Sequence, residues 1–313
     1  MKQAMPSTPI LVVIPMFNAE PFIKKAIQSI LDQSHSDFKL LIVNDGSTDG
    51  SEEAARSFQD DRIIVRNQAN SGVGSVMNTA IEFAREGGIP FIACMAADDI
   101  SMSKRLEIQL QLLNDYSQAA CGSNSYYMES DTEQIIGSST VPSSSWLIKW
   151  EIFHGLRGLI EGACTFRTSA LAEVGGFRKV FTQAEDTDIF LRLAERYELM
   201  NSPQFLYKIR LNFGGLSVRN YRKNVLYHMY ALDCSYRRRR GKTELDIASF
   251  ENSLTHTQKI KILREVKYLE SWRDYLTRRN YLSLISAAIL SPRRLLSRVL
   301  RILDKGNKVS ERT

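Results

Sequence analysis

Short apolar runs alternate with amphipathic segments in the first third of the chain, and this alternation restricts the fold more than any other feature. The apolar runs are rich in aliphatic and β-branched residues, as is typical of strands buried on both faces. They lie at residues 9–14, 39–43, 62–66 and 90–95. The amphipathic segments repeat apolar residues at helical spacing and lie at residues 19–33, 74–85 and 103–115. This alternation predicts an α/β fold with a mainly parallel, doubly wound, Rossmann-like sheet flanked by helices.

Three of the predicted strands lead into loops that carry polar side chains. The loops read PMFN at residues 15–18, NDGS at 44–47 and AADD at 96–99. Because ligands of such sheets bind outside the carboxyl ends of the strands, we expect these loops to meet at one edge. The sequence therefore predicts a site that combines an aromatic ring, an amide and several carboxylates.

Charge is divided unevenly along the 313 residues. Residues 214–313 hold 22 Lys and Arg against 9 Asp and Glu, a net charge of +13, which leaves a net charge of −7 for residues 1–213. An acidic body with a basic tail suggests an anionic partner for the tail.

Several classes of protein lack their motifs in this sequence. The four cysteines are widely spaced and the four histidines show no ligand spacing, so neither a zinc module nor a disulfide framework is indicated. We find no GxGxxG after a strand, no GxxxxGKS/T and no GxSxG, which argues against a dinucleotide oxidoreductase, a P-loop kinase and a serine hydrolase. We expect reduced thiols in a cytoplasmic protein without a signal peptide or a membrane-spanning helix.

Four blocks of sequence resemble the family 2 glycosyltransferases, which bind nucleotide sugars on a GT-A fold. The blocks are VVIPMFNAEPFIKKAIQSILDQSHSDFKLLIVNDGSTDGS, NSGVGSVMNTAIEFA, FIACMAADDISMSKRLEIQ and GACTFRTSALAEVGGFRKVFTQAEDTDIFLRLAE, in family order over nearly 190 residues. The resemblance implies a GT-A domain over residues 1–215, with a nucleotide-sugar-binding half at about 9–125 and an acceptor-side half at about 126–215. Residues 216–313 then form a basic helical C-terminal region.

The resemblance assigns the first two loops to the donor nucleotide. Pro15, Phe17 and Asn18 match the family's Pro-x-Tyr-Asn loop, in which the aromatic ring lies on the uracil face, and Phe17 keeps that stacking face without the hydroxyl. Asp45 matches the second acid of Asp-Asp-Gly-Ser and is expected to accept a hydrogen bond from the base imide, which favours uracil or thymine. From the residues alone, Phe17 could instead be core packing and Asp45 a turn residue. The further donor-side matches are Asn70, Gly72 and Asn78.

The resemblance also implies a divalent cation, Mn²⁺ or Mg²⁺, that neutralises charge on the departing nucleoside diphosphate. Asp98 matches the last acid of the family's Asp-x-Asp motif, while the first position is Ala96. We therefore assign metal binding to Asp98 and Asp99, with Asp98 also counted among the donor-binding residues. From the residues alone, the two acids could instead cap the helix that follows.

Glu185 and Asp186 match the family's Glu-Asp pair before a helical pattern. The resemblance implies that Asp186 is the catalytic base of an inverting transfer, which removes the proton of the attacking acceptor hydroxyl, and that Glu185 lies at the nucleotide sugar. The alternative from the residues alone is a pair of acids that complements the dipole of a helix N-terminus.

The last part of the tail predicts a basic amphipathic helix at residues 293–305, with leucine, isoleucine and valine on one face and basic residues opposite. Such a helix suits an anionic membrane surface, although its apolar face could instead pack on the body or on a second subunit. We expect a cytoplasmic protein, peripheral on the inner face of the cytoplasmic membrane.

These features together predict a hexosyl or related transferase of polysaccharide biosynthesis. It would move a sugar from a UDP- or dTDP-sugar to a hydroxyl of a glycan or lipid-linked acceptor, and we expect no nucleic acid as a partner. The alternative is a noncatalytic nucleotide-sugar or polyanion-binding protein whose metal site is degenerate at Ala96.

Overall fold

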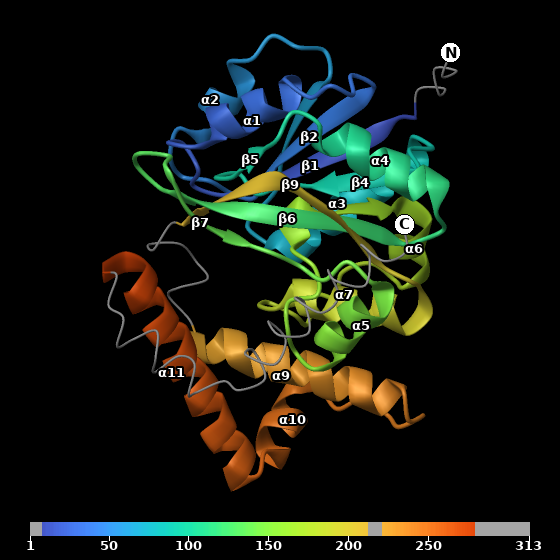
Figure 1. Cartoon of the computed structure of the whole chain (residues 1–313), viewed down its shortest axis with the longest axis vertical. Helices are drawn as coiled ribbons and strands as arrows, with labels where there is room; N and C mark the ends of the chain where they lie inside the picture. Colours follow the sequence, from blue (N-terminus) through green and yellow to red (C-terminus); the bar gives the residue numbers. More distant parts are fainter. Residues whose placement is uncertain (1–7, 212–220, 279–313) are drawn as a thin grey trace, which may run out of the picture. The chain divides into compact units, whose positions relative to one another are not determined.

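The computed structural model describes residues 8–211 and 221–278, with side chains up to residue 271 (Figure 1). These residues form two compact units that alternate along the chain, and each unit is described by itself. Unit 1 comprises the described residues of Met1–Val141, Leu159–Lys179 and Arg196–Leu211, and unit 2 those of Pro142–Gly158, Val180–Glu195 and Asn212–Thr313. The domain boundary predicted near residue 215 falls outside the described residues and stays a prediction.

Unit 1 begins with four parallel strands and the helices between them, in agreement with the predicted alternation. The elements are β1 Ile10–Met16, α1 Ile23–Leu31, β2 Phe38–Asn44, α2 Ser51–Arg56, β3 Ile63–Asn67, α3 Val73–Glu86 and β4 Phe91–Cys94. The strands lie in the order β3-β2-β1-β4, so that Val13 of β1 stands between Leu41 of β2 and Cys94 of β4. The carboxyl ends of these strands therefore share one edge, as expected.

Beyond β4 the sheet becomes mixed. The remaining elements of unit 1 are β5 Ile100–Ser101, α4 Arg105–Asp115, β6 Ala120–Glu129, β7 Ile135–Ser139, η1 Glu161–Ala163, β8 Thr165–Arg167, α6 Thr168–Glu173 and β9 Met200–Leu211. The order continues as β4-β8-β6-β9-β5, with β7 also paired to β6. Strand β9 runs parallel to β6, whereas β8, β7 and β5 pair antiparallel with their neighbours. The α/β fold with flanking helices is confirmed, with its continuous parallel part in the first four strands.

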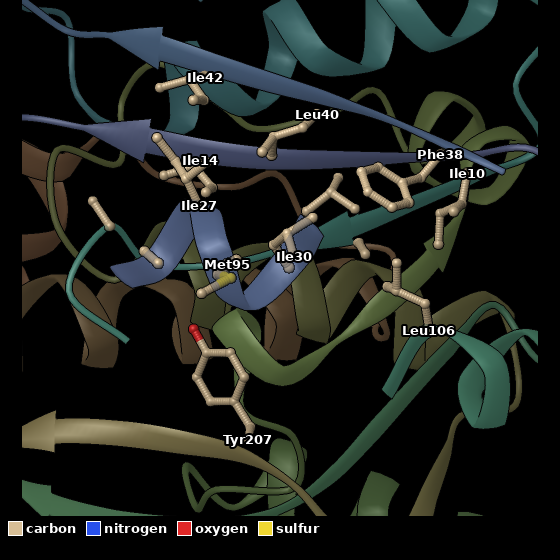
Figure 2. Close-up of a cluster of buried hydrophobic side chains, with 14 of the residues drawn as sticks. Ile10, Ile14, Ile27, Ile30, Phe38, Leu40, Ile42, Met95, Leu106 and Tyr207 are labelled. Atoms are coloured by element: carbon tan, nitrogen blue, oxygen red, sulfur yellow. The ribbon is translucent and has the colours of Figure 1, made fainter. Parts of the chain in front are cut away.

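The core of unit 1 explains why the first strands form where they do. Strand β1 is buried on both faces, so its uninterrupted aliphatic run has no solvent-facing position. Helix α1 buries Ile23, Ala26, Ile27 and Ile30 on one face and exposes its lysines. Figure 2 shows this face against β1 and β2, with Tyr207 of β9 pointing toward Met95. Burial of each such isoleucine contributes about 1.5–3 kcal/mol.

Unit 2 is helical in its described part. It holds α5 Ser145–Phe153, α7 Glu185–Arg196 up to residue 195, α9 Tyr221–Arg238, α10 Ile247–Ser253 and α11 His256–Arg278. Phe181, just before α7, stacks on Tyr230 of α9 with 5.2 Å between ring centroids, and Arg238 of α9 donates to both carboxylate oxygens of Glu195 at 2.9 Å. The first part of the basic tail is thus packed on the helix that carries Glu185 and Asp186.

Two expectations about the chain as a whole can be compared with the described residues. Cys94, Cys121, Cys164 and Cys234 are buried free thiols. Within residues 8–211 and 221–278, no helix combines the length and apolar character that a membrane span requires. The amphipathic helix predicted at 293–305 lies outside the described residues.

Candidate active site

The loops after β1 and β2 are fastened to each other by hydrogen bonds. The backbone N–H of Asn18 donates to Ser47 Oγ at 3.0 Å, and the N–H of Thr48 donates to Asn18 Oδ1 at 2.8 Å. Asn18 adopts a left-handed conformation with φ 48°, which asparagine tolerates better than most residues. The N–H of Asp45 donates to the carbonyl of Met16 at 2.8 Å. The predicted residues of these two loops therefore lie together at the carboxyl edge of the sheet.

Phe17 is the exposed aromatic side chain of this edge. Its side chain is 36% exposed, whereas Pro15 before it pairs with Val43 at the end of β1. The alternative that Phe17 belongs to the core is therefore wrong. An accessible aromatic ring offers a face for stacking.

Asp45 is buried and joins the loop after β3 to the loop after β2. Its Oδ1 accepts hydrogen bonds from Gln68 Nε2 at 2.7 Å and from the N–H of Ser71 at 2.9 Å, and its Oδ2 accepts one from the N–H of Gly72 at 2.8 Å. Gly72 has a φ of 83°, a left-handed conformation that favours glycine. A carboxylate offers about four lone-pair sites, so Oδ2 has capacity for a further donor. The sequence had not singled out Gln68, which is 23 residues away from Asp45.

The turn that carries Asp45 keeps its shape with Asn44 in place of an acid. Asn44 Oδ1 accepts the N–H of Ser47 at 3.0 Å, as the turn-forming capacity of asparagine predicts. Gly46 has a φ of 79°, and a Cβ atom there would lie 3.1 Å from the backbone nitrogen of Asn70. The backbone of Asn70 therefore passes directly over this turn, which brings the third predicted segment to the same edge.

Asn78 lies farther along α3 and has a structural partner. Its Nδ2 donates to the carbonyl of Phe177 at 2.8 Å, and its Oδ1 accepts the N–H of Phe177 at 2.8 Å. Gly176 stands next to this pair with a φ of 65°, and a Cβ atom there would lie 2.6 Å from Asn78 Oδ1. The amide of Asn78 thus holds the 175–177 turn on α3, and its contact with a donor stays a prediction.

Asp99 points into the protein. It is 7% exposed, and its Oδ1 accepts the N–H of Arg210 in β9 at 2.7 Å. The hydroxyl of Tyr207 accepts the N–H of Ala96 at 3.0 Å and donates to the Asp99 carboxylate. Burial, together with the charge of neighbouring Asp98, raises the pKa of Asp99 to about 7. This carboxylate therefore anchors the 96–99 loop to β9.

Asp98 is half-buried, and burial raises the pKa of its carboxyl. Its backbone carbonyl accepts a hydrogen bond from Arg210 Nε at 2.7 Å. The guanidinium of Arg210 also donates to the carbonyl of Ser130 at 2.5 Å and to Glu133 Oε1 at 2.7 Å. Sequence reasoning missed Arg210. The available signal was a basic residue between two aliphatic residues, Ile209 and Leu211, because a buried guanidinium requires polar partners.

A second buried guanidinium lies behind this loop. The Arg105 side chain of α4 is fully buried, donates to the carbonyls of Cys94 at 2.7 Å and Cys164 at 3.1 Å, and lies 5.0 Å from the Tyr207 ring centroid. Burial lowers the pKa of Arg105, and the neighbouring Tyr207 and Asp99 oppose that shift. Arg105 was likewise not among the predicted site residues.

Glu185 and Asp186 begin α7 in unit 2. Ala184 before them has a φ of 55°, and Asp186 Oδ1 accepts the N–H of Thr187 at 2.7 Å. Burial, together with the neighbouring Asp186, raises the pKa of Glu185 to about 7. Asp188 differs from both, because it is buried in an ion pair with Arg192 at 2.7 Å. The donor-side residues belong to unit 1, so the predicted roles of Asp186 and Glu185 stay predictions.

The described residues contain no cluster of three or more His, Cys, Asp or Glu side chains suited to hold a metal ion. The carboxylates of the 96–99 loop are the half-buried Asp98 and the inward-facing Asp99. Mg²⁺ is typically bound through one or two carboxylates together with substrate phosphates and waters, so this donor set fits a cation that enters with a diphosphate.

Comparison with known proteins gives one family and several relatives. The model of the family described as "Glycosyl transferase family 2" matches residues 11–181. The chain is 33% identical over 148 residues to "Uncharacterized glycosyltransferase EpsJ" of Bacillus subtilis (strain 168), an alignment that covers 47% of this chain and 42% of the relative. It is 24% identical over 274 residues to "Chondroitin synthase" of Pasteurella multocida (strain Pm70), with 83% of this chain and 27% of the synthase covered. The chain therefore spans less than half the length of either relative.

Solved structures of similar fold include two with bound nucleotide sugars. A structure of S. aureus TarS 1-349 in complex with UDP-GlcNAc has a TM-score of 0.56 at 15% identity and covers 90% of each chain. The mannosyltransferase PcManGT from Pyrobaculum calidifontis, in complex with GDP-Man and Mn²⁺, has a TM-score of 0.54 at 15% identity and covers 96% of this chain and 80% of that one. At this level of identity the likeness concerns the fold, and it confirms the predicted fold class.

Proposed function

Because the chain belongs to glycosyl transferase family 2, we propose that it transfers a sugar from a nucleoside-diphosphate sugar to a hydroxyl of a glycan or lipid-linked acceptor. The observation that carries this proposal is the joining of three loops around Asp45 at the carboxyl edge of β1 and β2, beside the exposed ring of Phe17. This is the edge of the sheet where ligands of α/β folds bind.

The donor base is proposed to lie on Phe17 and to donate its imide N–H to Asp45. The half-used Oδ2 of Asp45 supports this assignment, since it accepts one hydrogen bond from Gly72 and has capacity for another. A carboxylate accepts and does not donate at this position, which favours a uracil or thymine base. The donor would then be a UDP- or dTDP-sugar, with Asn70 and Gly72 approaching it from the loop after β3.

Asp98 is the residue proposed to hold a divalent cation, Mn²⁺ or Mg²⁺. Its half-buried carboxylate supports this role. Asp99 holds the loop through Arg210 and Tyr207 and is proposed to contribute to the same cation site, behind Asp98. A bound cation of this kind supplies neutralisation of charge on the diphosphate. The fully buried Arg105 would hold the inner side of the same loop in place.

Asp186 is proposed to be the base of an inverting transfer. The acceptor oxygen would attack the anomeric carbon from the face opposite the diphosphate, and its proton would pass to the Asp186 carboxylate as the bond to the diphosphate breaks. Glu185, with its pKa raised to about 7, would stand next to this base largely neutral below that pH. The donor-binding role predicted for Glu185 remains part of the proposal.

The proposal is tested by donor binding and sugar transfer in the same preparation. Binding of UDP- and dTDP-sugars is measured calorimetrically with Mn²⁺, and transfer is measured as release of the nucleoside diphosphate with free and lipid-linked glycan acceptors. Asp186→Asn is expected to reduce the rate by about 10²-fold or more and to leave donor affinity unchanged. Glu251→Gln, an exposed carboxylate of α10 in the same unit, serves as the control and retains full activity.

A wild-type protein that binds the donor and transfers no sugar to any acceptor would instead support the second candidate, a noncatalytic nucleotide-sugar-binding protein. Ala96, in place of the first metal-binding acid, is the observation that favours this candidate. Full activity of Asp186→Asn would remove Asp186 from the mechanism.

A further inference from the structure

A histidine of the C-terminal region contacts the residue next to Asp186. His228 lies in α9, where its Nδ1 is 3.0 Å from Thr187 Oγ1 and its Nε2 is 3.2 Å from the carbonyl oxygen of Gly155. All of these residues belong to unit 2. The imidazole thus bridges the start of α7 and the turn after α5.

The two contacts determine which ring nitrogen carries the hydrogen. A carbonyl oxygen only accepts, so the contact with Gly155 assigns the hydrogen of the neutral ring to Nε2. Nδ1 then presents a lone pair and accepts the hydroxyl hydrogen of Thr187. In this tautomer the direction of the Thr187–His228 hydrogen bond is fixed.

Thr187 has one hydroxyl hydrogen and two acceptors within reach. His228 Nδ1 lies at 3.0 Å and Asp186 Oδ1 at 3.4 Å from its Oγ1. Asp186 Oδ1 already accepts the backbone N–H of Thr187 at 2.7 Å. As long as the hydroxyl donates to His228, it does not donate to the carboxylate of Asp186.

The contact with Gly155 requires a close approach of two elements. Gly155 has a φ of 70°, and a Cβ atom there would lie 2.9 Å from His228 Nε2 and 2.8 Å from Leu232 Cδ1. A side chain at this position would therefore force the side chains of His228 and Leu232 to shift. Phe181 holds the same helix through Tyr227 and Tyr230, with ring centroids 6.3 and 5.2 Å apart. The imidazole is thus placed by packing on both sides.

We propose that His228 is a positioning residue for sugar transfer: it accepts the Thr187 hydroxyl and so keeps that hydrogen away from the base Asp186. A carboxylate that accepts one hydrogen bond fewer is the stronger proton acceptor. The inference rests on the proposed role of Asp186 and assigns a function to a residue about 40 positions away in the sequence.

The proposal predicts a pattern among variants that packing alone does not produce. His228→Leu frees the Thr187 hydroxyl to donate to Asp186, and kcat falls about tenfold with an unchanged donor KM, the effect of roughly one hydrogen bond to a charged group. His228→Asn places an amide oxygen near the position of Nδ1 and regains at least half of the lost activity. His228→Gln places its amide near Nε2, keeps the contact with Gly155, and is as slow as His228→Leu.

The decisive variant is Thr187→Val in the His228→Leu background. Valine has no hydroxyl to place on Asp186, so the double variant is expected to be several-fold faster than His228→Leu alone. Thermal unfolding of each variant shows whether it is folded at the assay temperature. A double variant as slow as or slower than His228→Leu would overturn the proposal and leave His228 a packing residue.

The same set of proteins separates this inference from the function on which it rests. Loss of transfer in Asp186→Asn, together with wild-type kcat in all His228 variants, would overturn the role of His228 and keep Asp186 as the base. Wild-type activity of Asp186→Asn would overturn the role of the base itself.

Discussion

Glu133 accepts ion pairs from two cations that differ sharply in burial, and this difference allows a test of what holds the Asp98 loop. Arg210 and Lys25 lie 2.7 and 2.9 Å from the same Oε1 atom, with side chains 1% and 61% exposed, respectively. We therefore compare Arg210→Met with Lys25→Met, because methionine retains most of the apolar stem in each case.

The expected loss in the free energy of unfolding follows from the hydrogen-bond partners that each cation would lose. Arg210→Met deprives the carbonyls of Asp98 and Ser130 of charged donors, and each such hydrogen bond contributes about 1.5–3 kcal/mol. Water can reach part of the emptied space, so we take the lower value of this range, about 1.5 kcal/mol, for each of the two hydrogen bonds. The expected loss in the free energy of unfolding is then about 3 kcal/mol. Lys25→Met breaks an exposed pair and is expected to cost less than about 1 kcal/mol.

Urea unfolding of both variants, followed by far-ultraviolet circular dichroism, measures the two losses from the change in midpoint at constant slope. The backbone N–H of Arg210 still donates to Asp99 in the methionine variant, so the comparison isolates the guanidinium. Equal losses for the two variants, or a loss below about 1 kcal/mol for Arg210→Met, would refute the view that the buried guanidinium fastens this loop.

Two further predictions concern the donor site and the acids of α7. Phe17→Ala is expected to raise the Kd of UDP about tenfold by loss of stacking, and Phe17→Tyr to keep it within about twofold; calorimetry that finds equal Kd values would exclude the stacking role. The pKa of Glu185 is raised from 4.5 to about 7 in the folded protein, so the folded state holds a proton that the unfolded state releases between these values. This contribution to stability is complete below about pH 4.5 and is lost by pH values above about 7. Glu185→Gln should therefore weaken the decline in stability between pH 5 and pH 8 in urea unfolding, and an unaltered decline would show that Glu185 does not cause it.

The first half of the sheet could be predicted because strands β1, β2 and β4 are largely buried on both faces and the helices between the strands are buried on one face. Periodicity alone then places the loops that follow β1, β2 and β4 at one edge. Strand β6 could not be found in this way, because Ser123, Asn124 and Ser125 are buried within it and interrupt any apolar pattern. Tertiary pairing with β9 decides that strand, and such pairing overrides local preference.

The candidate site was predicted where single loops carry it and missed where distant segments meet. Phe17 and Asp45 follow directly from their place after a strand, and the exposure of Phe17 excludes core packing, while its stacking role stays a prediction. Gln68, Arg210 and His228 have no local signal for the partners they contact, because those partners lie tens of residues away in the chain. Contacts of this kind are set by topology and not by spacing.

The alternation of the two units along the chain has a consequence for the exchange of one unit by genetic recombination. The chain crosses from one unit to the other five times, at 141/142, 158/159, 179/180, 195/196 and 211/212. A single cut near residue 215 would keep Glu195 and Thr187 and remove their partners Arg238 and His228. The second unit is therefore not a module that could be exchanged in one recombination event, and its acidic helix and its basic helices are inherited together.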